Sequence, residues 1–137
     1  MSEPQVTGGC QCGAVAYRID GKVYRLNVCH CRDCQIQSGS AFGMSLIIEP
    51  DAFQLVSGQL TTFELTADSD RTKTCAFCPV CGVRIYNRTS ALMSVKAGTL
   101  NDVSQLSPDA HYWTARKQSW VALPADLPCH EFAEEDR

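Results

Sequence analysis

Short runs of apolar residues, most of them bounded by glycine, proline or aspartate, dominate the pattern along the chain. Runs of this length are typical of β-strands rather than of long amphipathic helices. Asp20-Gly21 and Ser57-Gly58 each separate two such runs, so the sequence predicts two β-hairpins. The expected strands are residues 14–19, 23–28, 41–48, 54–56, 60–65, 72–77, 83–86, 92–96 and 111–115.

Helical patterns are few. Residues 32–37 are expected to form one helical turn, and residues 99–106 a short helix that ends before Pro108. Many short strands with so little helix predict an all-β domain.

The length of 137 residues fits a single domain, residues 1–137. The net charge is −3, from 12 basic and 15 acidic residues, and no basic stripe is present, so nucleic acid is not an expected partner. The longest apolar runs, such as residues 44–48, are too short to span a membrane. Residues 1–5 have neither the basic nor the apolar region of a secretory signal, which predicts a cytoplasmic protein.

Cysteines change this picture, because the chain has nine of them. An odd number without an export signal argues against a disulfide framework. Thiols gathered so closely are best explained as metal ligands, although cysteines alone do not distinguish zinc from iron. Eight of the nine fall into three clusters, at positions 10 and 12, at 29, 31 and 34, and at 75, 78 and 81.

Cys78 and Cys81, followed by Gly82, have the spacing of a metal knuckle, in which two thiolates approach one ion from a tight turn. A tetrahedral structural zinc needs four protein ligands, so a distant pair must supply the other two. Cys10 and Cys12 are the natural candidates, with disulfides or chance proximity as the alternatives. Such a site would join the start of the chain to its middle.

The second cluster offers three sulfurs, from Cys29, Cys31 and Cys34. In an extended segment Cys29 and Cys31 point to one side and His30 to the other. Three protein ligands with an exchangeable fourth position distinguish a catalytic zinc from a structural one. Two alternatives remain: the cluster is a redox dithiol, or Cys75 or His30 closes the shell and makes the site structural.

Polar residues outside the clusters are further candidates. Arg32 is expected to pair with Asp33 or with water rather than to contact a substrate carboxylate. His111 is expected to be packed or hydrogen-bonded rather than a ligand. Ser38 and Ser40 fit a pocket lining and a turn equally well. Cys129, near the end of the chain, is interpreted as incidental.

Three motifs stand out along the chain: residues 8–17 (GGCQCGAVAY), residues 29–35 (CHCRDCQ) followed by 38–42 (SGSAF), and residues 77–82 (FCPVCG). Together they resemble the glutathione-dependent formaldehyde-activating enzyme family. His111-Tyr112-Trp113 and Trp120 are similar to the C-terminal region of that family, so the resemblance covers about residues 5–132.

The resemblance implies a β-tent fold of antiparallel sheets with two zinc ions per chain. It implies a structural zinc at Cys10, Cys12, Cys78 and Cys81 and a catalytic zinc at Cys29, Cys31 and Cys34. The implied activity joins glutathione and formaldehyde to S-(hydroxymethyl)glutathione, classed as a carbon–sulfur lyase in the reverse sense. The alternative hypotheses are a zinc-binding scaffold without catalysis and, last, a thiol redox role of the methionine sulfoxide reductase kind.

Overall fold

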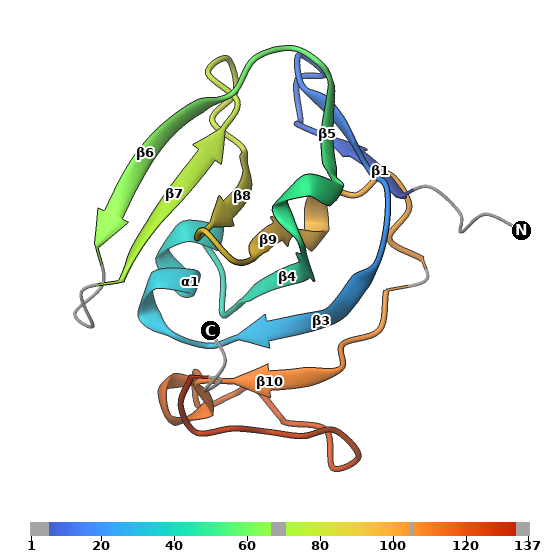
Figure 1. Cartoon of the computed structure of the whole chain (residues 1–137). Helices are drawn as coiled ribbons and strands as arrows, with labels where there is room; N and C mark the ends of the chain where they lie inside the picture. The colour runs from blue at the N-terminus through green and yellow to red at the C-terminus, as the bar shows by residue number, and fades with distance from the viewer. Residues whose placement is uncertain (1–5, 67–70, 105, 134–137) are drawn as a thin grey trace, which may run out of the picture.

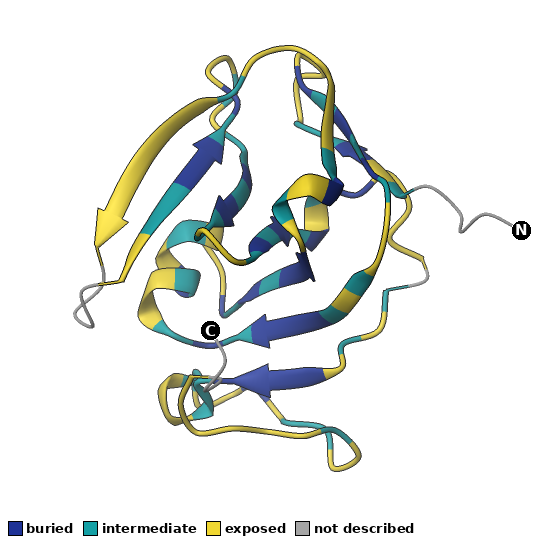
Figure 2. Ribbon diagram, viewed as in Figure 1, coloured by how far each residue is buried: buried dark blue, intermediate teal, exposed yellow. Residues whose placement is uncertain are grey.

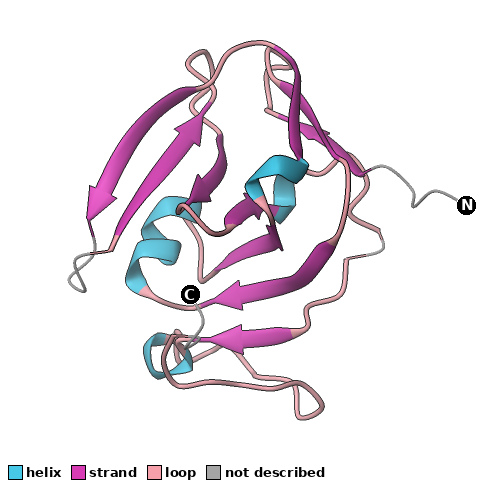
Figure 3. Ribbon diagram, viewed as in Figure 1, coloured by secondary structure: helices cyan, strands magenta, loops and turns pink. Residues whose placement is uncertain are grey.

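The computed structural model describes residues 6–66, 71–104 and 106–133. Within these ranges the chain forms ten strands, one α-helix and three short 3-10 helices, which confirms the predicted all-β class (Figure 3). The strands are β1 (Val6–Gly9), β2 (Ala16–Ile19), β3 (Val23–Cys29), β4 (Gly43–Ile48), β5 (Phe53–Ser57), β6 (Thr61–Thr66), β7 (Thr72–Phe77), β8 (Arg84–Arg88), β9 (Met93–Lys96) and β10 (Ala110–Tyr112). The helices are α1 (Arg32–Ser38), η1 (Pro50–Ala52), η2 (Ala97–Thr99) and η3 (Thr114–Arg116).

The strands form two sheets. The small sheet has the order β1-β2-β5, and the large sheet has the order β10-β3-β4-β9-β8-β7-β6. Neighbouring strands are antiparallel except for β10 and β3, which are parallel. Figure 1 shows the large sheet curving around α1, with β6 and β7 on one flank and β3 and β10 on the other. Among the described residues, no helix is long and apolar enough to cross a membrane.

The two faces of the large sheet differ because side chains alternate along each strand. Leu26, Leu46 and Val95 lie opposite one another on β3, β4 and β9, and all belong to the main hydrophobic core. Tyr17 and Ile19 of the small sheet complete this core. Figure 2 shows that buried residues lie in both sheets. The other face carries a polar cross-strand row, Asn27, Ser45 and Lys96. This face is turned toward α1, and Cys29, of the cluster with Cys31 and Cys34, lies on it.

The first predicted hairpin, residues 14–19 with 23–28, is wrong. Strand β2 pairs with β1 and β5, while β3 enters the large sheet. The backbone N–H of Asp20 donates to the carbonyl of Ala52, 2.8 Å away, instead of closing a turn onto β3. Tyr17 and Ile19 are at most 2% exposed. These side chains are covered by packing the small sheet against the large one, so β2 and β3 separate.

The second predicted hairpin, residues 54–56 with 60–65, is also wrong. Strand β5 pairs with β2, and β6 pairs with β7. Gly58 has a left-handed φ of 85°, and a Cβ on it would lie 2.0 Å from the carbonyl oxygen of Ala14. The turn therefore packs against the loop after β1 and carries the chain from one sheet to the other.

The helical predictions are confirmed in one place and wrong in the other. Residues 32–37 form α1, which continues to Ser38 and ends at Gly39, a left-handed residue with φ 64°. No helix spans the described part of residues 99–106: η2 ends at Thr99, and Asn101 donates its backbone N–H to Thr7 of β1 over 2.9 Å. Residue 105 lies outside the described residues.

Candidate metal centres

The first cluster joins two loops from different sheets. Cys10 and Cys12 lie between β1 and β2, and Cys78 and Cys81 lie between β7 and β8. All four Sγ atoms are within 4.8 Å of one another, with 3.6 Å between Cys10 and Cys12 and 3.8 Å between Cys12 and Cys78. A regular tetrahedron with zinc–sulfur bonds of about 2.3 Å has edges of about 3.8 Å. The donor set therefore fits a tetrahedral zinc, and no disulfide is formed.

Both loops share one backbone hydrogen bond, and other N–H groups of each loop donate to its sulfurs. The N–H of Cys10 donates to the carbonyl of Val15 over 3.1 Å, and the N–H of Cys78 donates to the carbonyl of Val83 over 3.0 Å. The N–H of Val15 also donates to the Sγ of Cys10 over 3.2 Å. A hydrogen bond from the N–H of Val83 to Cys81 lowers the pKa of that thiol to about 6. A backbone donor thus favours the thiolate at Cys81, whereas at Cys12 the hydrogen bond from the N–H of Ala14 is outweighed by burial and the neighbouring thiols, which raise the pKa of that thiol to about 11.

Glycine residues permit these tight turns. Gly13 and Gly82 have φ values of 85° and 81°, which side chains of L-amino acids rarely adopt. A Cβ on either glycine would meet nothing within 4 Å, so backbone conformation and not space selects glycine here.

The second cluster lies where β3 runs into α1. Cys29 is the last residue of β3, Cys31 caps the helix, and Cys34 is in its first turn. The backbone N–H of Cys34 donates to the Sγ of Cys31 over 3.4 Å, so a thiol takes the usual place of a serine or aspartate cap. All three thiols are partly exposed.

The three Sγ atoms lie within 4.8 Å of one another. Within the described ranges, no further Cys, His, Asp or Glu brings a ligand atom into this group. The Sγ of Cys29 donates to that of Cys31 over 3.3 Å, about 0.5 Å less than the edge of a zinc–sulfur tetrahedron. The cluster can thus hold a divalent ion through three sulfurs after a small opening, with one position left for a ligand from outside.

Shared protons set the charge of the metal-free cluster. Hydrogen bonds from the thiols of Cys29 and Cys34 lower the pKa of Cys31, and the bond to Cys31 raises the pKa of Cys29. These hydrogen bonds favour the thiolate at Cys31, at the N-terminus of α1, over that at Cys29.

Three cationic side chains from neighbouring strands gather on the α1 side of the large sheet: Lys73 of β7, Arg84 of β8 and Lys96 of β9. Lys73 acts on the charge of Cys31, and Lys96 on the charges of Cys34 and Cys29. Burial lowers the pKa of Lys96 to about 8, opposed by the negative charge of Cys34. This cationic group was not predicted from the sequence, because its members are far apart in the chain.

Contacts hold two of these cations in place. The guanidinium of Arg84 donates to Oε1 of Gln37 on α1 and to Oδ1 of Asn87, both over 2.8 Å, and its carbon lies 4.9 Å from the ring centre of Phe63. The ammonium of Lys96 donates to the hydroxyl of Ser45 over 3.3 Å. Positive charge is thus fixed between α1 and the large sheet.

His30 points away from the sulfurs, as alternation predicts. Its ring is fully buried, and Nε2 lies 2.9 Å from Nδ1 of His111 on β10. Burial lowers the pKa of both imidazoles. Neither histidine joins a sulfur group, in agreement with the expectation that His111 is hydrogen-bonded rather than a ligand.

The family described as glutathione-dependent formaldehyde-activating enzyme matches residues 5–116, most of the chain. The chain belongs to this family. No curated protein matches the sequence. A crystal structure of a Rhodobacter sphaeroides protein is similar in fold, with a TM-score of 0.57 and 18% sequence identity, over 72% of this chain and 91% of that one.

The remaining candidates of this family member lie outside both sulfur groups. Cys75 is fully buried in β7 and does not complete the second cluster, and Cys129 is exposed with its Sγ 3.5 Å from the carbonyl of Leu127. Arg32 donates to Oε1 of Gln35 over 2.7 Å, so its partner differs from the expected Asp33. Ser38 donates to the carbonyl of Gln35 over 3.3 Å, as a turn residue would.

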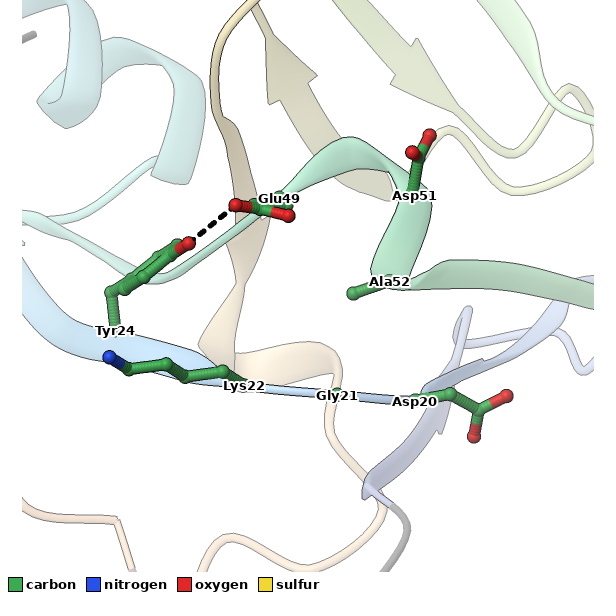
Figure 4. A pocket seen from close by; sticks show the side chains of 7 residues that line it. All are labelled: Asp20, Gly21, Lys22, Tyr24, Glu49, Asp51 and Ala52. Atoms are coloured by element: carbon green, nitrogen blue, oxygen red, sulfur yellow. Dashed lines mark hydrogen bonds between the residues drawn. The ribbon is translucent and has the colours of Figure 1, made fainter.

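A surface pocket of about 200 Å³ lies beside η1 (Figure 4). Its lining contains no cysteine. The hydroxyl of Tyr24 donates to Glu49 over 2.6 Å, and Asp20 is paired with Arg18 at 2.6 Å. The acidic groups of this pocket are therefore largely occupied with neighbours, and the chemistry-bearing residues gather at the cysteine clusters.

Proposed function

We propose that the chain is a zinc-dependent carbon–sulfur lyase-type enzyme that acts on a thiol–aldehyde adduct and resembles S-(hydroxymethyl)glutathione synthase. In this proposal Cys29, Cys31 and Cys34 hold the catalytic zinc, and the other zinc is structural, bound by Cys10, Cys12, Cys78 and Cys81. The observation that carries the proposal is the sulfur group of three, to which no further protein ligand is added among the described residues. Family membership supports glutathione and formaldehyde as the thiol and the aldehyde.

In the proposed reaction the thiol sulfur bonds to the carbonyl carbon, and the carbonyl π pair moves to oxygen. The thiol loses its proton, the oxygen gains one, and the product is a hydroxymethyl thioether; the reverse reaction breaks the same carbon–sulfur bond. A zinc ion at this cluster supplies the Lewis acidity that keeps a bound thiol deprotonated at neutral pH.

The cations of the chain bind and orient the substrate in this mechanism. Three thiolates and one divalent ion carry a net charge of about −1, which Lys73, Arg84 and Lys96 outweigh. An anionic thiol such as glutathione is therefore attracted to the cluster. The ammonium of Lys96 also stabilises negative charge that develops on the aldehyde oxygen.

The test compares an anionic thiol with a neutral one. Lys96→Met is expected to raise KM for glutathione by about tenfold or more, because a charge-assisted contact is lost, and to raise KM for 2-mercaptoethanol much less. Lys22→Met is the matched control, since Lys22 is exposed and lies over the ring of Tyr24.

A second variant tests the metal directly. Cys31→Ser is expected to abolish turnover while the zinc of the first cluster and the fold remain. Unchanged turnover in Cys31→Ser, or no turnover by the zinc-loaded wild type with any small thiol and aldehyde, would contradict the proposal.

The proposal extends to the compartment, the domain organisation and the partners of the protein. All nine cysteines are unpaired, which suits a reducing compartment, and we place the protein in the cytoplasm. We also treat residues 1–137 as one domain, because one core contains residues from both sheets. The net charge of −3 supports small-molecule partners rather than nucleic acid.

A further inference from the structure

Behind the second cluster, on the side away from the sulfurs, lies a pair of hydrogen-bonded histidines. His30 stands between Cys29 and Cys31, its ring is fully buried, and Phe42 packs against it at 5.4 Å between ring centres. Its Nε2 is 2.9 Å from Nδ1 of His111, whereas its Nδ1 has no hydrogen-bond partner among the described residues. His30 thus depends on His111 for the hydrogen bond of its side chain.

His111 is itself held by a segment close to the end of the chain. Its N–H donates to the carbonyl of Pro128 over 3.0 Å, and its carbonyl accepts from the N–H of His130 over 2.9 Å. The rings of Tyr112 and His130 stack at 4.8 Å between centres. Residues 128–130 therefore support the outer edge of β10.

The backbone of the cysteine loop is tied to the same region. The N–H of His30 donates to the carbonyl of Tyr112 over 3.0 Å. The side-chain amide of Gln35, buried in α1, donates to the carbonyl of His30 over 2.8 Å and to that of Arg116 over 3.0 Å. These bonds hold the loop backbone in its present position, so a rotation of the loop that gives His30 a new partner also moves the neighbouring sulfurs.

We propose that His111 is a positioning residue for the second metal cluster. Its hydrogen bond fixes the ring of His30 on one side of the loop and so fixes the sulfurs of Cys29 and Cys31 on the other. Without it, Nε2 of His30 is buried with no partner, and the loop must rotate to satisfy it, which moves both sulfurs. The inference rests on the metal assignment of the proposed function but not on its substrate.

The test measures zinc affinity in the zinc-loaded full chain by competition with a chromophoric chelator. Cys34→Ser and Cys81→Ser identify which phase belongs to which cluster. His111→Phe keeps an aromatic ring but removes the nitrogen, and it is expected to weaken the second site by about 10- to 100-fold while the first site is unchanged. His111→Asn places an amide at the position of Nδ1 and is expected to restore most of the affinity.

The matched control is His130→Phe, which keeps the ring that stacks on Tyr112 and should leave both sites at wild-type affinity. Wild-type affinity of both sites in His111→Phe overturns the inference. Two other results also overturn it. One is a loss of zinc affinity at the second site in His111→Asn while His111→Phe retains it. The other is equal weakening of both sites, which would mean a general loss of fold. Because the readout is metal affinity, absence of turnover overturns the proposed function and leaves this result standing.

Discussion

Gly43 lies beneath the second cluster and offers a sharp test of its geometry. It is the first residue of β4 and lies opposite Cys29 on β3. A Cβ at this position would be 3.2 Å from Cβ and 3.6 Å from Sγ of Cys34. The absence of a side chain at Gly43 therefore gives the first turn of α1 its room.

The cost of Gly43→Ala follows from these distances. Carbon atoms in contact prefer about 3.5–4.0 Å, so Cys34 must move by about 0.3 Å or more. A metal site tolerates about 0.2 Å in its bond lengths. Overpacking of a tight site costs about 1–3 kcal/mol. If this cost falls entirely on the zinc-bound protein, the zinc affinity falls by about 5- to 150-fold. Gly43→Val is expected to lie at the upper end of that range.

Chelator competition on the zinc-loaded protein measures the effect at each cluster. Gly43→Ala should weaken the second site by about tenfold and leave the first unchanged. Gly98→Ala is the matched control, because a Cβ at Gly98 meets nothing within 4 Å. Unaltered affinity of the second site in both Gly43 variants would refute the packing argument, and so would equal weakening of the two sites.

Two further predictions concern stability. Gln35→Leu removes the buried donor to the carbonyl of His30 and should lower the free energy of unfolding by about 1–3 kcal/mol, measured by urea denaturation; an unchanged midpoint would contradict this. Burial raises the pKa of Tyr17, opposed by its hydrogen bond with Thr99. The unfolded chain then releases this proton first, so stability should fall as pH rises through about 10 in the wild type and fall less in Tyr17→Phe. Equal pH slopes of the two proteins would exclude Tyr17 as the cause.

Local features of this chain could be predicted from sequence. The cysteine spacings predicted the same two groups of sulfurs that the structure forms, because the ligands within each loop are only two or three positions apart. Strand β7 and the helix α1 were predicted from local patterns, with bounds that differ from those of the structure by at most one residue.

Pairing between distant segments could not be predicted in this way. Asp20-Gly21 and Ser57-Gly58 are turn sequences that suit both a hairpin and a connection between two sheets. The burial of Tyr17 and Ile19 between the sheets favours the connection, and it is not visible in a local pattern. Strand β1 was missed because it has four residues, two of them glycine.

The surroundings of the second cluster were missed for a related reason. Lys73, Arg84 and Lys96 come from three strands, and their meeting depends on the register of the large sheet. The contact between His30 and His111 depends on the parallel pairing of β10 with β3, which no local pattern indicates.

The central claim is that one of the two metal ions has three protein sulfurs and an exchangeable fourth ligand. X-ray absorption at the zinc edge counts sulfur neighbours directly in the protein loaded with two zinc ions. The proposal predicts an average of about 3.5 sulfurs per zinc, rising to about 4 when glutathione is added. An average of about 4 without any thiol, or one that stays at about 3.5 with glutathione in excess, would contradict it.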